Sequence, residues 1–334
     1  MISPTHAHSR SAAAGHIRQA LELQCPCCKG SLGRLSAPEA KTGYPLFCSG
    51  CDFELWCLSG IWRALPPERE MYFERFISEY QAVRSAEGRG SNDSTYYLDL
   101  PYHDATGRNS AQWTIRSHSF SYLERKILPA IEAQHKGGMD VLDLGAGNCW
   151  LSYRLALRGH RAVAIDLLTN QDDGLGAATH FRGQLQVLFP RFQAEVDRLP
   201  FPDSQFDVAI FNASFHYTEN YEATLAEALR CLRSTGVVII ADSPWYSNDA
   251  SGQEMLAQRR AHFVARYGFA SDSLTSLEYL TDERLRVLEH RCGVSWQRHS
   301  PYYGLRWFMR PWVAKLRRRR EPSQFRIYVA AVRK

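Results

Sequence analysis

The 334-residue sequence lacks the features of a secreted or membrane-spanning protein. Residues 1–21 contain no continuous apolar segment, so they do not read as a secretory signal. No stretch of about 18 consecutive apolar residues occurs, which excludes a membrane-spanning helix. The nine cysteines are uneven in number and unevenly placed, unlike those of a secreted disulfide-bonded scaffold. We therefore expect a cytoplasmic protein whose thiols stay reduced.

The sequence also has little net charge. Its 40 basic and 35 acidic residues leave a formal charge of +5, so the average composition does not indicate a nucleic-acid partner. The hydrophobic fraction of 45% is ordinary for a soluble globular protein with a sizeable core. The length suits one large domain with a small one, or two medium domains. The basic residues crowd near the C-terminus, at Arg310, Lys315 and 317–320.

What the sequence does have is two Cys-x-x-Cys pairs, Cys25/Cys28 and Cys48/Cys51, with 19 residues between them. Four thiolates on tight turns are the tetrahedral ligand set of zinc. A reactive thiol pair is the rival interpretation, but it would not need the second pair, and a register that uses Cys27 stays open. The spacing predicts a structural zinc ribbon over 21–65, because a unit of ~40 residues cannot build a sufficient core without metal.

Composition divides the rest of the chain. We expect residues 1–20 to be a disordered lead-in, 66–135 to be helical, and 136–334 to be one α/β domain with an insertion at about 300–322. Strands and helices alternate in that domain, which favours a parallel sheet with helices on both faces. The predicted strands are 140–145, 161–166, 192–196, 206–212, 236–243, 294–299 and 325–334. The predicted helices are 68–88, 117–134, 148–159, 175–189, 221–234, 252–267 and 281–292.

A glycine turn follows the first of these α/β strands. The run 141–147, Val-Leu-Asp-Leu-Gly-Ala-Gly, leads an apolar strand into a helix, where a bare backbone and unpaired N–H groups can meet a ligand. Asp166, 19 residues beyond Gly147, ends the next strand and can accept hydrogen bonds from both ribose hydroxyls. A dinucleotide site needs a third glycine, but Trp150 stands there. The pattern indicates an adenosine-containing cofactor without a pyrophosphate, such as S-adenosylmethionine.

Four segments within 138–245 resemble class I S-adenosylmethionine-dependent methyltransferases: VLDLGAGNCWLSYRLALRGH, AVAID, AEVDRLPFPDSQFDVAIFNASFHYT and LRCLRSTGVVIIAD. The Leu-Pro-Phe-x-Asp-x-x-Phe-Asp run is characteristic of the ubiquinone/menaquinone-methylase-like branch, methyltransferase type 11. The resemblance implies a Rossmann-like, seven-stranded, mostly parallel sheet.

It also implies nine residues around the cofactor: Asp143, Gly145 and Gly147 at the methionine end, Asp166 at the ribose, Glu195 and the backbone of Val196 at the adenine, Asn212 in the pocket wall, and Ala146 and Leu167 as further cofactor-binding residues. Cys149 stands where relatives often have a third glycine.

His216 is the one candidate for a catalytic base, because it follows the fourth strand of the resemblance. A histidine that either lines the pocket or is packed in the interior is the favoured interpretation, since methyl transfer is an in-line displacement that mainly requires alignment. The segment 302–320 mixes aromatic and basic residues and allows three roles. It could cover the substrate pocket, contact an anionic membrane surface, or bind RNA.

We predict an S-adenosylmethionine-dependent methyltransferase that acts on a small or lipid-like metabolite, with 66–135 forming a lid over the cofactor. Two alternatives remain. The first is an RNA base methyltransferase, because the ribbon resembles those that precede some enzymes methylating a guanine in ribosomal RNA, although it is not markedly basic. The second is a non-catalytic cofactor-binding interaction protein, which the intact Asp143, Gly145, Gly147, Asp166 and Glu195 argue against.

Overall fold

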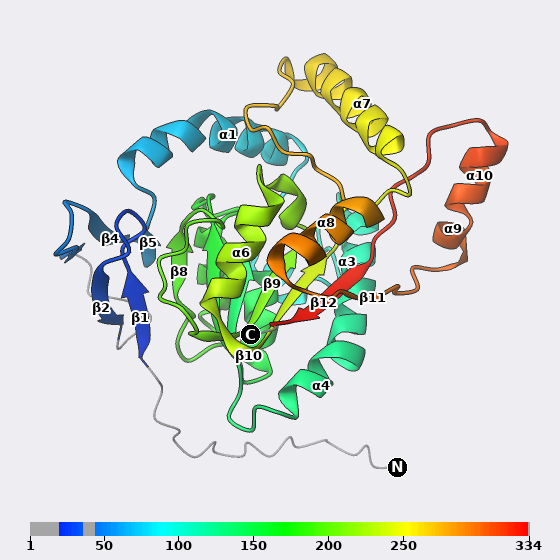
Figure 1. The fold of residues 1–334 in the computed structure, drawn as a ribbon. Coiled ribbons are helices and arrows are strands. Elements are labelled where there is room, and N and C mark those ends of the chain that lie inside the picture. The colour runs from blue at the N-terminus through cyan, green and yellow to red at the C-terminus, as the bar shows by residue number, and fades with distance from the viewer. Residues whose placement is uncertain (1–19, 36–43, 333–334) are drawn as a thin grey trace, which may run out of the picture.

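The computed structural model describes residues 20–35 and 44–332. The predicted lead-in, residues 1–20, therefore lies outside the described residues except for its last member. Within the described part, ten strands form one sheet in the order β11-β12-β10-β9-β6-β7-β8-β5-β4-β3, and β1 and β2 form a separate hairpin (Figure 1). None of the helices described is both long and apolar enough to cross a bilayer.

The strands are β1 Leu21–Gln24, β2 Ser31–Leu35, β3 Leu46–Phe47, β4 Glu54–Leu58, β5 Ile61–Arg63, β6 Asp140–Leu144, β7 Arg161–Asp166, β8 Arg191–Gln193, β9 Phe206–Asn212, β10 Leu232–Ala241, β11 Gln297–His299 and β12 Ile327–Ala331. The α-helices are α1 Pro67–Ala86, α2 Ser94–Asp99, α3 Ser110–Tyr122, α4 Leu128–Glu132, α5 Trp150–Leu157, α6 Tyr221–Cys231, α7 Asp249–Tyr267, α8 Asp282–Cys292, α9 Leu305–Phe308 and α10 Arg310–Leu316. Shorter helical turns are η1 Leu123–Ile127, η2 Leu175–Phe181 and η3 Phe215–Tyr217.

The predicted seven-stranded sheet is confirmed. Strands β6 to β10 run parallel to their neighbours, in the order β8-β7-β6-β9-β10. Strand β12 runs antiparallel between β10 and β11, so one reversed strand makes the sheet mostly rather than wholly parallel. The chain order reverses direction at β6, where parallel α/β sheets place their ligands at the carboxyl ends of the strands.

Two predicted helices differ from the structure. The helix expected over 117–134 is divided into α3, the π-helical turn η1 and α4, because Pro129 has no N–H to continue the helical ladder. The helix expected over 175–189 is only the 3₁₀ turn η2. Gly183 weakens a helix, and Pro190 disfavours helical backbone at the residue before it.

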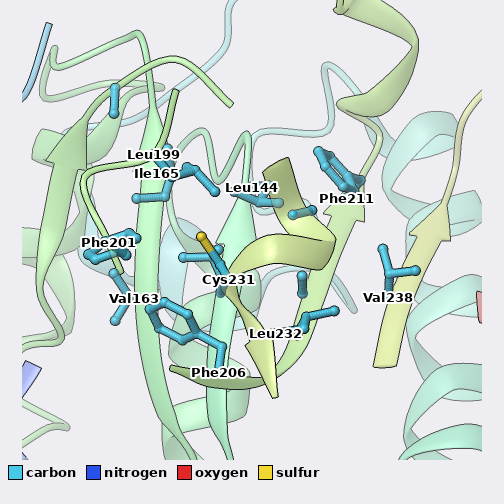
Figure 2. Close-up of a cluster of buried hydrophobic side chains, with 14 of the residues drawn as sticks. Leu144, Val163, Ile165, Leu199, Phe201, Phe206, Phe211, Cys231, Leu232 and Val238 are labelled. Carbon is cyan, nitrogen blue, oxygen red and sulfur yellow. The ribbon is translucent and has the colours of Figure 1, made fainter. Parts of the chain in front are cut away.

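Alternating side chains of the strands feed two hydrophobic cores, one on each face of the sheet. Leu144, Val163 and Ile165 belong to the first core, which α6 and α8 cover (Figure 2). Val141 and Ala164 point to the second core, which α3, α5 and η2 cover. Helices therefore shield both faces of the sheet from water, as its near-continuous apolar strands require.

The cysteine-rich segment is part of the same body. Strand β5 adds to the sheet in parallel with β8, through Trp62 opposite Phe192 and Arg63 opposite Gln193. The first core also continues into this segment, where it includes Leu23 and Leu55. Residues 21–65 therefore share both a sheet and a hydrophobic core with the α/β domain, and the three strands β3, β4 and β5 extend the seven to ten.

Candidate functional site

A large pocket opens at the carboxyl ends of β6, β7, β8 and β9, underneath α1. Its empty volume is about 1200 Å³, open solvent at the mouth included, which is ample for a nucleoside-sized ligand. All nine residues predicted around the cofactor line it: Asp143, Gly145, Ala146, Gly147, Asp166, Leu167, Glu195, Val196 and Asn212.

The turn after β6 requires its glycines. Gly145 has φ +75°, and a Cβ added there would lie 2.3 Å from the Cβ of Ser214. The Gly147 N–H donates to Oδ2 of Asp166 at 2.7 Å, which joins the turn to the end of β7. Cys149, which stands where a third glycine is common, has φ +64° and so keeps the left-handed backbone that glycine would adopt. The substitution preserves the shape of the loop at the cost of strain.

Two carboxyl groups lie at the floor of the pocket, Asp143 fully buried and Asp166 partly exposed. Asp143 accepts hydrogen bonds from the N–H and the Oγ–H of Ser152, at 3.1 and 2.7 Å. Burial raises its pKa to about 7. Asp166 accepts from the backbone of Gly147 and Leu168, yet burial raises its pKa to about 6. Both groups are therefore held in a setting that a cationic ligand would stabilise in the ionised form.

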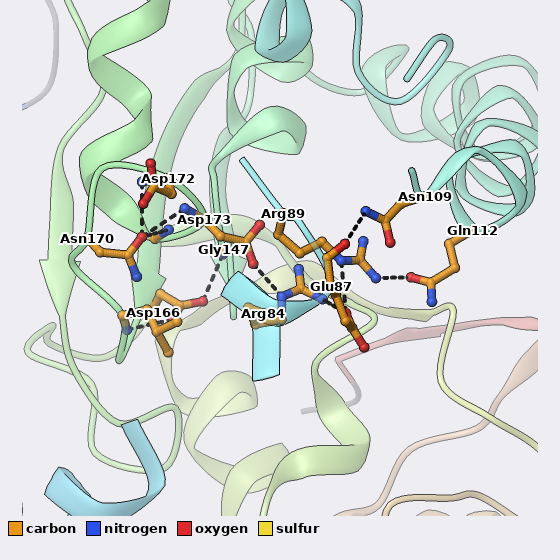
Figure 3. A network of polar contacts seen from close by, with 12 residues as sticks. Arg84, Glu87, Arg89, Asn109, Gln112, Gly147, Asp166, Asn170, Asp172 and Asp173 are labelled. Carbon is orange, nitrogen blue, oxygen red and sulfur yellow. Dashed lines mark hydrogen bonds and ion pairs between the residues drawn. The ribbon is translucent and has the colours of Figure 1, made fainter. Parts of the chain in front are cut away.

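Helix α1 supplies basic partners to this acidic pocket, which the sequence did not indicate. Arg69 donates to both carboxylate oxygens of Glu195, at 2.9 and 2.7 Å. Arg84, four turns further along α1, pairs with Asp173 in the loop after β7 (Figure 3). Asn170 shapes that loop by accepting from three successive N–H groups, those of residues 172–174. Helix α1 is thus fastened across the pocket at two points.

A second cavity adjoins the first and is lined from α1, α3, α7 and residues 271–278. His216 lines neither of these two cavities. Its side chain is buried with Nδ1 3.3 Å from Oγ of Ser243, and burial lowers its pKa to about 3. The packed interpretation of His216 therefore fits better than a catalytic base, because the ring does not face the ligand space. Its neighbour Tyr217 lines both cavities.

The four predicted zinc ligands meet at one point. Their sulfur atoms all lie within 4.8 Å of one another, with Cys25 3.5 Å from Cys51 and Cys28 3.3 Å from Cys48. Tetrahedral zinc with sulfur at about 2.3 Å places its ligands about 3.8 Å apart, so the arrangement fits the ion. Cys27 is exposed and outside the cluster, which favours the register with Cys25.

The turns that carry these ligands suit a metal knuckle. A Cβ on Gly30 or Gly50 would come within 3.3 or 3.2 Å of the Cys28 sulfur, so glycine leaves room for the cluster. The Gly50 N–H points at the Cys48 sulfur at 3.4 Å and lowers the pKa of that thiol to about 7. A thiol that ionises near neutral pH is a ready metal ligand.

The insertion at about 300–322 forms α9 and α10, which stand out from the body on the side away from the N-terminal strands (Figure 1). Leu305, Trp312 and Leu316 are 67%, 66% and 86% exposed. No residue of 300–322 lines either cavity, so the interpretation that it covers the substrate pocket finds no support in them. Contact with a membrane or with RNA stays a prediction.

Comparisons with known proteins agree with this geometry. A family model described as "Methyltransferase domain" matches residues 142–240, from β6 to β10. A malonyl-[acyl-carrier protein] O-methyltransferase of Yersinia pestis is 28% identical over 120 residues, which are 36% of this chain and 42% of that protein. The chain thus matches less than half the length of this curated relative.

Two solved structures match this chain at low sequence identity. The complex of the Haloferax volcanii Trm112 methyltransferase activator with a methyltransferase matches at 17% identity and a TM-score of 0.47, over 69% of this chain and 92% of that one. The Burkholderia thailandensis 1,6-didemethyltoxoflavin-N1-methyltransferase, solved with 1,6-didemethyltoxoflavin and S-adenosylhomocysteine, matches at 16% identity and a TM-score of 0.44, over 87% of this chain and 100% of that one.

Proposed function

We propose that this chain, whose residues 142–240 match a methyltransferase domain, transfers the methyl group of S-adenosylmethionine to a small or lipid-like metabolite. The observation that carries the proposal is the pocket at the carboxyl ends of β6 to β9. It joins a glycine turn, an acid at the end of β7 and an acid after β8 in one ligand space.

The lining of this pocket fits the cofactor. The amino-acid end of S-adenosylmethionine carries positive charge on its ammonium and sulfonium groups, and six acidic side chains line the pocket. Asp143 and the turn 145–147 would hold that end, and Asp166 the ribose. Glu195 and Val196 would face the adenine, with Asn212 in the wall.

S-adenosylmethionine supplies an electrophilic methyl group when it is bound. The task left to the protein is to align the acceptor with that group and to exclude water. Helix α1 suits both requirements, because Phe73, Phe76 and Tyr80 line the pocket from it. The packed His216 has no part in this proposal.

A small acceptor is supported by the second cavity, whose empty volume is about 760 Å³ with open solvent included. The Yersinia pestis relative, named for O-methylation of malonyl-[acyl-carrier protein], supports an acyl or lipid-like acceptor. We further propose that Cys25, Cys28, Cys48 and Cys51 hold a structural zinc ion.

Calorimetry with S-adenosylmethionine tests the proposal. The wild type should bind, and Asp166→Ala should remove most of the affinity, because the ribose contact and the anchor of Gly147 are both lost. Asp172→Ala is the matched control, since its exposed side chain follows the same strand but does not line the pocket. Absence of binding by the wild type would overturn the assignment of the cofactor. A mass-spectrometric screen of metabolites for a gain of one methyl group then identifies the acceptor.

A further inference from the structure

The second cavity differs in charge from the pocket beside it. Six acidic residues and three arginines line the first pocket, whereas four arginines and two glutamates line the second cavity. The four arginines are Arg84, Arg89, Arg116 and Arg259. The first pocket thus suits a cationic ligand, and the second cavity suits an anionic one.

The two spaces adjoin. Six residues line both, namely Phe76, Tyr80, Arg84, Arg116, Tyr217 and Leu274. A molecule in the second cavity would therefore lie next to a cofactor in the first, as a methyl acceptor must.

Three of the four arginines have acidic partners. Arg84 pairs with Asp173, Arg89 with Glu87, and Arg259 with Glu278. Figure 3 shows the first two pairs, together with the contact from Arg89 to Gln112. Even so, Nη1 of Arg89 and Nε of Arg259 are buried without a hydrogen-bond partner in the described part of the chain.

Arg116 on α3 is the exception. Within residues 20–35 and 44–332 its guanidinium forms no ion pair or side-chain hydrogen bond, and its Cζ atom lies 4.8 Å from the centroid of the Trp113 ring. Burial lowers its pKa, and the charges of Arg84 and Arg89 lower it further. Asp242 acts in the opposite direction but is too weak to reverse the shift. The positive charges that line this cavity repel one another, and a bound anion would offset that repulsion.

The remaining wall is apolar or aromatic. Phe76, Val83, Phe263 and Leu274 line the second cavity alongside Tyr80 and Tyr217. An occupant would therefore carry a compact apolar or aromatic body next to its charged group.

We propose that the second cavity binds an anionic group of the methyl acceptor, a carboxylate or a phosphate, and that Arg116 is its main partner. This inference rests on the proposed function, because only a methyltransferase has an acceptor to hold. It defines the substrate class as a small anionic metabolite with an apolar or aromatic body. Arg116 would act as a binding residue, since a guanidinium forms paired hydrogen bonds with either oxyanion.

Anion titrations of the full zinc-loaded chain test this inference. Benzoate represents a carboxylate with an apolar body, inorganic phosphate represents the other anion, and chloride at matched ionic strength is the reference. Each is titrated by calorimetry and by thermal melting, with and without S-adenosylhomocysteine. We expect benzoate, phosphate or both to bind saturably, and the arm that responds identifies the anion.

Arg116→Gln should weaken that binding about 10-fold or more, because a charge-assisted contact is lost, while the affinity for S-adenosylhomocysteine stays within about 3-fold. Arg116→Lys keeps the charge and should retain part of the binding, so the comparison holds even where glutamine is not tolerated. Arg260→Gln is the control, because its half-exposed side chain lies on α7 outside the cavity.

Two results would overturn the inference. Benzoate and phosphate could both behave like chloride, or Arg116→Gln could weaken S-adenosylhomocysteine and leave the anions unaffected, which would assign Arg116 to the carboxylate of the cofactor. Failure of the wild type to bind S-adenosylhomocysteine would instead overturn the proposed function and, with it, the acceptor role. Saturable anion binding that Arg116→Gln abolishes would then mark an anion site of another kind.

Discussion

Arg69 of α1 and Glu195 after β8 form a two-pronged ion pair, with N···O distances of 2.9 and 2.7 Å, in the pocket at the carboxyl ends of β6 to β9. The Glu195 side chain is only 4% exposed, so the pair is largely shielded from water. It ties the helix that covers the pocket to a residue that would contact the cofactor. Under the proposed function, Glu195 would both hold α1 over the pocket and face the adenine of the cofactor.

Loss of this pair should destabilise the protein. Arg69→Ala leaves the buried Glu195 without a partner, and we expect a decrease of about 2–3 kcal/mol in the free energy of unfolding. Urea denaturation measures it. Arg75→Ala is the control on the same helix, because the Arg75 side chain is 69% exposed and its solvent-screened pair with Glu79 should contribute little to stability. Equal effects of the two variants would contradict a special role for the Arg69 pair.

The affinity for S-adenosylmethionine should depend on pH. The pKa values of Asp143 and Asp166 are raised to about 7 and about 6, so both groups take up protons as pH falls from 7.5 to 5.5. The ionised forms attract the cationic cofactor, so affinity should rise with pH through this range and level off above it, by up to about tenfold per pH unit for each group. Calorimetry between pH 5.5 and 7.5 measures the slope. Asp166→Asn should make it shallower, and a flat wild-type profile would exclude these carboxyl groups from binding.

His216 should contribute to acid sensitivity rather than to catalysis. Its pKa is lowered to about 3 in the folded protein, below the ordinary value of about 6.5, so the unfolded chain binds the extra proton between these values. The stability associated with a neutral His216 is complete above about pH 6.5 and decreases as pH falls toward 3. At pH 5 the loss is about 2 kcal/mol.

Denaturation at pH 7.5 and pH 5 checks this expectation. The free energy of unfolding should differ less between the two pH values in His216→Gln than in the wild type, because the variant has no titrating ring at that position. His118→Gln is the control, since its side chain is exposed. If His216→Gln lost as much stability between pH 7.5 and pH 5 as the wild type does, the ring would not be buried as a neutral group.

Zinc removal should affect the whole protein. The cysteine cluster packs into the first hydrophobic core, and β5 is a strand of the central sheet. Cys28→Ser or a chelator should therefore abolish bound zinc, lower the melting temperature and weaken cofactor binding, because β5 leads directly into α1. Metal analysis and thermal melting measure both effects.

Cys27→Ser is the matched control for this prediction. Cys27 is exposed and outside the cluster, so the variant should keep its zinc and its melting temperature. Loss of zinc from Cys27→Ser but not from a Cys25 variant would reverse the assigned register.

The features predicted from the sequence are those that short-range rules govern. The turn at 145–147 needs glycine because its backbone angles are left-handed. The position of Asp166 is predictable because β7 runs parallel to β6, so the two strands end at the same edge of the sheet. The nine pocket-lining residues came from the resemblance to class I methyltransferases, and in the structure they lie at or just after the carboxyl ends of β6, β7, β8 and β9. The division of the helix at Pro129 could have been anticipated from the proline, but the apolar pattern masked it.

The position of the ribbon and of α1 could not be predicted. The pairing of β5 with β8 joins residues about 130 positions apart, and nothing in the local pattern of Ile61–Arg63 identifies its partner strand. The acidic partners of Arg69 and Arg84 are likewise remote in sequence, although both arginines lie on a helix whose existence was evident.

By itself, the sequence determined the α/β class, the glycine turn with its acid, and the two Cys-x-x-Cys pairs, because spacing along the chain is enough to specify each of them. Only the tertiary structure decided that Cys25 rather than Cys27 joins the cluster, that His216 faces the interior, and that arginines from α1, the turn after it, α3 and α7 surround one cavity. Those outcomes depend on packing between elements far apart in the chain. A side chain's local sequence specifies its chemistry, and its neighbours in space decide what that chemistry can act on.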